Sequence, residues 1–134
     1  MNLNEKLNKL NSNPKRLFLI DAVGAIVSAF FHGVVLVKLE KLVGIPVPAL
    51  YFSALFPVVF SIYDFLCYLK LKKSIKFFLK IIAYANILYC FVSIGVTSYY
   101  FNEVTYLGWV YILVEIFIIL VLVTIELKVI KRLR

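Results

Sequence analysis

Long apolar runs separated by short polar stretches dominate this chain. They cover about residues 17–37, 47–69, 77–100 and 105–127. Each run holds roughly twenty residues or more, and a helix that rises about 1.5 Å per residue over that length crosses the ~30 Å hydrocarbon core of a bilayer. The pattern therefore predicts an all-α integral membrane protein. Its single membrane domain, with four transmembrane helices, spans residues 17–128 between terminal tails at residues 1–16 and 129–134.

The tail at residues 1–16 is polar and basic. Its leucines at Leu3, Leu7 and Leu10 recur at helical spacing, which is typical of a short helix lying on the membrane surface. A frayed polar tail is the alternative. Pro14 ends any such helix before the first apolar run begins.

Polar residues share one side of each predicted helix when residues are placed at about 100° intervals. In the first run, Asp21, Ser28 and His32 lie together, and the opposite side is large and apolar. The other runs have polar or small faces formed by Ser53, Pro57, Asp64 and Tyr68, by Asn86, Cys90, Ser93 and Thr97, and by Gly108, Tyr111, Glu115 and Glu126. Because lipid cannot satisfy polar groups, these faces should turn toward one another. We expect an antiparallel four-helix bundle with a polar interior.

An inner polar layer is predicted close to the basic edges of the runs, counting about 1.5 Å of depth per residue. It contains Asp21, Asp64 and Asn86, with Tyr68 or Tyr84 as candidate hydroxyl partners. A purely structural role for the two aspartates, as hydrogen-bonding groups near the interface, is the alternative.

An outer layer holds Glu115 and His32, which differ by less than one helical turn in depth. A contact between the two side chains is geometrically possible if their helices are neighbours. A charged side chain near the middle of a bilayer costs about 2.5–3.5 kcal/mol, so Glu115 should be protonated, paired or hydrated. Packing without further function is the alternative for this pair. Glu126 lies near the predicted cytoplasmic surface and requires no partner.

Positive charge is distributed unequally between the two ends of the predicted helices. The net charge is +8, and the lysines and arginines cluster in the two tails and in the connection that follows the second run. This distribution predicts the cell membrane as the location, with both termini cytoplasmic. Aromatic residues near the third connection form a belt at the opposite interface, namely Tyr99, Tyr100, Phe101, Tyr106 and Trp109. Because the cations mark membrane edges, the net charge does not indicate nucleic-acid binding.

No sequence motif of a hydrolase, a redox pair or a nucleotide-binding loop is present, so we expect no enzyme. One histidine cannot supply the usual histidine pair of a haem or zinc site, and we predict neither cofactor nor metal. A mixed site of His32 with carboxylates is a weaker alternative. Cys67 and Cys90 lie inside apolar runs and are interpreted as free thiols.

Two functions remain open. The first is ion or small-solute handling through the polar interior, in a protein that would need to form a homodimer because four helices enclose little space. Its candidate site residues are Glu115, His32, Ser28, Tyr111, Asp21, Asp64 and Asn86. The second is an accessory or structural membrane subunit that binds anionic lipid or a partner protein through the basic connection. The candidate contacts there are Lys70, Lys72, Lys73 and Lys76.

Overall fold

A computed structural model describes residues 4–5, 8–9 and 13–133 of the chain. Four helical stretches are long and apolar enough to cross a membrane: Arg16–Lys38, Val47–Lys70, Ile75–Tyr99 and Tyr106–Arg132. The all-helical prediction is confirmed, and the predicted spans agree with these helices to within a few residues. The largest difference is in the last helix, which continues to Arg132 instead of ending near residue 127.

The first stretch is assembled from three consecutive segments, α2 (Arg16–Phe30), η1 (Phe31–Val35) and α3 (Leu36–Lys38). In η1 the backbone forms a π-helical turn, and the N–H of Leu36 donates to the carbonyl of Phe31, five residues earlier. Such a turn inserts one extra residue into the helix and rotates everything that follows it. The apolar pattern gave no indication of this turn, which lies at the position of His32.

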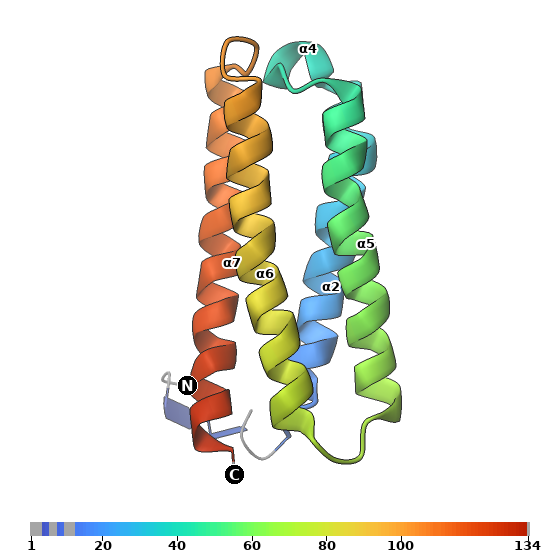
Figure 1. The fold of residues 1–134 in the computed structure, drawn as a ribbon, viewed down its shortest axis with the longest axis vertical. Helices are drawn as coiled ribbons and strands as arrows, with labels where there is room; N and C mark the ends of the chain where they lie inside the picture. The colour runs from blue at the N-terminus through green and yellow to red at the C-terminus, as the bar shows by residue number, and fades with distance from the viewer. Residues whose placement is uncertain (1–3, 6–7, 10–12, 134) are drawn as a thin grey trace.

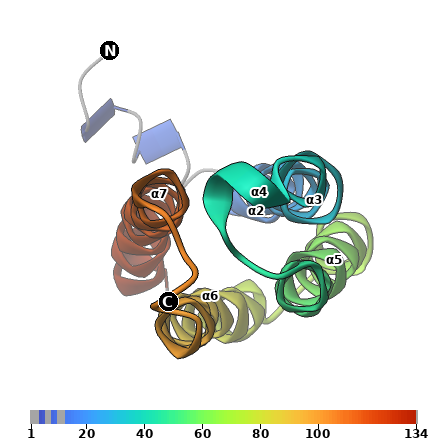
Figure 2. The ribbon, with the colours of Figure 1, turned by 90° about the horizontal axis from the view of Figure 1, so that it is seen from above.

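The helices are arranged as two hairpins (Figure 1). α2 packs along α5 (Val47–Lys70), and α6 (Ile75–Tyr99) packs along α7 (Tyr106–Arg132). Fewer contacts join the two pairs, chiefly between α5 and α6. In the view along the helices, the four surround a common centre (Figure 2). The start of α2 and the end of α7 lie at the same end of the molecule (Figure 1).

A short helix, α4 (Glu40–Val43), occupies the predicted first connection and contacts α7 at the far end of the bundle. Thr105 joins the two, because its Oγ1 donates to the carbonyl of Leu42 at 2.6 Å. The same oxygen accepts from the N–H of Gly108 at 3.2 Å and caps α7. Gly108 is needed here, since a Cβ at this position would collide with the carbonyl of Val43.

The opposite end contains the basic turn between α5 and α6. Ser74 precedes α6 in a left-handed conformation (φ 62°) and makes no side-chain cap hydrogen bond. Lys70, Lys72 and Lys73 are exposed there. The tail prediction around Leu3, Leu7 and Leu10 lies outside the described residues, although Asn8 accepts a hydrogen bond from Arg132 at 3.2 Å.

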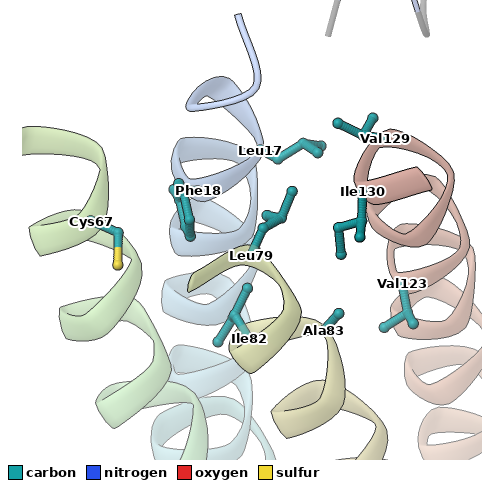
Figure 3. Packing of buried hydrophobic residues seen from close by; sticks show 9 residues of the cluster. All are labelled: Leu17, Phe18, Cys67, Leu79, Ile82, Ala83, Val123, Val129 and Ile130. Atoms are coloured by element: carbon teal, nitrogen blue, oxygen red, sulfur yellow. The ribbon is translucent and has the colours of Figure 1, made fainter. Parts of the chain in front are cut away.

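Two apolar clusters fill the ends of the bundle. The inner cluster joins all four helices near the basic turn through Leu17, Phe18, Cys67, Leu79, Ile82, Ala83, Val123, Val129 and Ile130 (Figure 3). The outer cluster packs beneath α4 through Leu36, Val43, Ile45, Ala49, Leu50, Cys90, Ile112 and Ile116. Large apolar side chains such as Val23, Ile26 and Phe30 point outward, as the helical faces predicted. The polar side chains lie between the two clusters.

Candidate functional site

Glu115 on α7 is the centre of the polar layer. Its side chain is only 8% exposed and accepts hydrogen bonds from four groups. Oε2 accepts from Ser28 Oγ at 2.8 Å and from Tyr111 OH at 3.2 Å, while Oε1 accepts from Tyr89 OH at 3.0 Å. His32 Nε2 lies 2.9 Å from Oε2 and 3.1 Å from Oε1. Donors from the first, third and fourth membrane helices therefore converge on one buried carboxylate.

The imidazole of His32 is enclosed by neighbouring side chains. It is 1% exposed and stands at edge-on angles to the rings of Tyr89 and Tyr111, with centroids 6.4 and 5.6 Å away. Its Nδ1 has no hydrogen-bond partner among the residues that the structure describes. The predicted contact between Glu115 and His32 is thus present, and the π-helical turn carries the imidazole into it.

A second polar group lies nearer the basic turn. Asn86 Nδ2 donates to both carboxylate oxygens of Asp21, at 3.1 and 3.3 Å, which confirms that these residues share a layer. Asp64 and Glu126 are fully buried beside Asp21 and interact with it electrostatically. Within the described part of the chain, none of the four carboxylate oxygens of Asp64 and Glu126 has a hydrogen-bond partner.

Two sequence-based interpretations of this second group are wrong. Tyr84 is 60% exposed and faces away from the interior, and Tyr68 forms no hydrogen bond with Asp21 or Asp64. Glu126 was expected near the cytoplasmic surface without need of a partner, yet it is 0% exposed. α7 extends past Glu126 to Arg132, and the inner apolar cluster covers that region, so this carboxyl is enclosed.

A cavity of about 370 Å³ lies in the middle of the bundle. Its polar wall is formed by Asp21, Ser28, Asn86, Tyr89, Tyr111 and Glu115. Apolar residues complete it, among them Val27, Phe31, Phe60, Val114 and Ile118. We call this space the central cavity. It brings the two polar groups together, because Glu115 and Asp21 both contribute to its wall.

The candidate residues separate into three sets. Glu115, His32, Ser28 and Tyr111 form one hydrogen-bonded cluster, and Asp21 and Asn86 form a second, with Asp64 behind it. The lysines lie apart at the basic turn, where Lys76 donates to the carbonyl of Leu133 at 3.4 Å.

Tyr89 is the functional candidate that the sequence reasoning missed. It lies on α6 less than one turn from Asn86, at the edge of the predicted polar face. It was not among the predicted site residues, although its hydroxyl donates to Glu115 at 3.0 Å and lies 3.2 Å from His32 Nε2. A buried tyrosine hydroxyl generally requires a partner, and that rule was the available signal.

The arrangement offers proton and cation chemistry. A carboxylate and an imidazole within hydrogen-bond distance can pass a proton between them. No group of three or more His, Cys, Asp or Glu side chains in the described ranges is arranged to hold a metal ion. Comparisons of this chain with protein families, with curated proteins and with solved structures find no match. The functional argument therefore depends on the geometry of the site.

Proposed function

We propose that this chain is a multi-pass protein of the cell membrane that exchanges a small cation or polar solute for a proton at Glu115 and His32. The four apolar helices support the membrane location. The distribution of lysine and arginine supports an antiparallel transmembrane bundle with both termini in the cytoplasm.

The observation that carries the proposal is a buried carboxylate–imidazole pair whose carboxylate, that of Glu115, lines a cavity. A charge near the middle of a bilayer costs about 2.5–3.5 kcal/mol, so ionisable groups retained there are usually functional. The Glu115 carboxylate forms its hydrogen bonds with groups that can rearrange, namely three hydroxyls and one imidazole. A cation entering the central cavity would favour loss of a proton from this pair.

Purified protein in liposomes that enclose the pH-sensitive dye pyranine tests this exchange. An inward gradient of tetramethylammonium or of potassium should make the interior more alkaline when the wild-type protein is present. We expect the response to disappear in Glu115→Gln and in His32→Ala, because each change removes one half of the pair.

Glu40→Gln is the matched control, since it removes an exposed carboxylate of α4 and should leave the response intact. Circular dichroism and gel filtration establish that each variant is folded. Folded Glu115→Gln and His32→Ala proteins with wild-type responses would contradict the proposal. A wild-type protein that shows no response to either cation, or to the amphiphile described below, would also contradict it.

The second candidate, an accessory subunit, is favoured by one observation: Lys70, Lys72 and Lys73 are exposed in a single turn. A cluster of lysines at a membrane edge attracts anionic lipid at about 1 kcal/mol per charge. Lys72→Ala with Lys73→Ala should then release bound anionic lipid or a co-purifying partner. Unchanged retention would argue against the basic turn as the contact site.

A further inference from the structure

The central cavity has an opening on the side of the bundle, between α2 and α7. Val27 of α2, Phe31 of η1, and Val114 and Ile118 of α7 line the cavity, and all four are also exposed on the outer surface. We call these four residues the portal. α2 packs on α5 and α7 packs on α6, so α2 and α7 share little contact with each other. In the view along the helices, α2 and α7 stand apart (Figure 2).

The portal faces the region that acyl chains occupy in the proposed topology. Its four side chains are apolar, as are the outward-facing residues on both sides of it. A molecule that reaches the cavity by this route must be soluble in the hydrocarbon region, because no polar group lines the entrance. A small cation dissolved in water would have to pass the apolar clusters at a bundle end, so the route through the portal favours a ligand with an apolar part.

The inner part of the cavity wall is acidic, with three clustered carboxyl groups and no cation paired with them among the described residues. Asp21 lines the cavity, and its hydrogen bonds come from the neutral amide of Asn86. No lysine, arginine or histidine in the described ranges forms an ion pair with Asp21. Behind it lie Asp64 and Glu126, fully buried and without hydrogen-bond partners. The one histidine of the chain is already paired with Glu115.

The apolar entrance is complementary to an apolar chain, and the acidic interior is complementary to a cationic group. A single ligand with both parts would match the cavity. We propose that the central cavity binds a single-chain amphiphile with a positively charged amine or ammonium head, which enters from the membrane through the portal. The head lies against Asp21, within the same cavity as Glu115, and the chain extends outward between Val27 and Ile118. A volume of about 370 Å³ is at the lower end of the range for ligand sites and suits a small head with part of its chain.

This inference rests on the proposed function, since it names the class of cation that the same site takes. Binding is measured by calorimetry on protein in lipid nanodiscs, with decyltrimethylammonium as the probe. Tetramethylammonium has the same head without the chain, and decyl sulfate has the chain with a negative head. We expect saturable binding of the first, at least tenfold weaker binding of the second, and none of the third.

Two substitutions separate the head site from the portal. Asp21→Asn should weaken decyltrimethylammonium binding at least tenfold, because it removes the ionisable carboxyl and keeps the shape. Val114→Trp should block entry, whereas Leu113→Trp should not. The two positions are adjacent and similarly exposed, at 51% and 55%, but only Val114 lines the cavity. Ile118→Trp and Phe117→Trp form a second pair of the same kind.

The outcomes distinguish this inference from the proposed function. Equal binding of tetramethylammonium and decyltrimethylammonium would overturn entry from the membrane, and the proton exchange would stand if liposomes still responded to tetramethylammonium. Binding of decyltrimethylammonium without any change of internal pH would support the ligand class and contradict the exchange. Equal effects of Val114→Trp and Leu113→Trp, or cross-linking that shows a second copy closing the portal, would overturn the inference.

Discussion

His32 Nε2 lies 2.9 Å from Glu115 Oε2, although 83 residues separate the two in the chain. The contact joins the first membrane helix to the last. These helices belong to different hairpins and share no extensive packing. The polar pair is therefore one of the few direct links between the hairpins in the middle of the bundle, and its loss should affect stability as well as exchange.

Replacing Glu115 by leucine should lower the free energy of unfolding by about 3 kcal/mol, because four groups lose their partner together and two of them, His32 and Tyr89, are buried. The double variant Glu115→Leu with His32→Leu should regain part of this loss, since no imidazole then remains unpaired. Unfolding by sodium dodecyl sulfate in mixed micelles, followed by circular dichroism, measures both. Strictly additive losses would show that the two side chains are not energetically coupled.

Tyr89→Phe should destabilise the protein by about 1 kcal/mol, a typical net value for a hydrogen bond inside a membrane protein. The phenol donates to Glu115 and also faces His32, so the exchange response should weaken too. Tyr84→Phe, on the exposed side of the same helix, is the control and should change neither quantity. If both variants behave alike, the Tyr89 hydroxyl has no special role.

Much of the architecture follows from the period of the apolar pattern. Four runs of sufficient length predict four helices. The segregation of polar residues put Asp21 and Asn86 in one layer and made a contact between His32 and Glu115 possible, and the structure shows both contacts. The predicted depth of each residue in the membrane decided which residues share a layer, because a helix rises about 1.5 Å per residue.

The apolar pattern could not predict the local backbone geometry of the first span, the burial of side chains near the helix ends or the pairing of the helices. The π-helical turn at Phe31–Val35 changes the direction of every later side chain in the first span, and no single residue in it requires the turn. Glu126 was misplaced because burial near a helix end depends on how far the neighbouring helices extend. The pairing of α2 with α5 and of α6 with α7, which opens the portal, is likewise a property of packing.

Gly108→Ala should destabilise the protein by about 2 kcal/mol or more. The added methyl group would collide with the carbonyl of Val43 and with Val104, so α4 and α7 would have to separate. Gly95→Ala is a matched control in α6, where nothing lies within 4 Å of the new atom. That change should stabilise the helix by about 0.5–1 kcal/mol. Equal effects of the two substitutions would show that the contact between α4 and α7 is not tight.

The topology is tested by single cysteines placed at opposite ends of the bundle. Lys73→Cys in the basic turn should react with a membrane-impermeant maleimide only when the cytoplasmic face is accessible. Asn102→Cys, between α6 and α7, should react from outside intact cells. Cys67 and Cys90 are buried and should contribute little background. Labelling of both new cysteines from the same side would contradict the antiparallel membrane topology.

Glu126→Met should increase the free energy of unfolding by about 1–2 kcal/mol, because burying a carboxyl without a hydrogen bond or counter-ion is unfavourable. Glu40→Met, at an exposed glutamate, should change it by less than about 0.5 kcal/mol. A loss of stability in Glu126→Met would mean that this carboxyl has a partner in the folded protein. If the variant is more stable but binds decyltrimethylammonium more weakly, then Glu126 acts through Asp21, as a member of the carboxyl group cluster that the head group approaches.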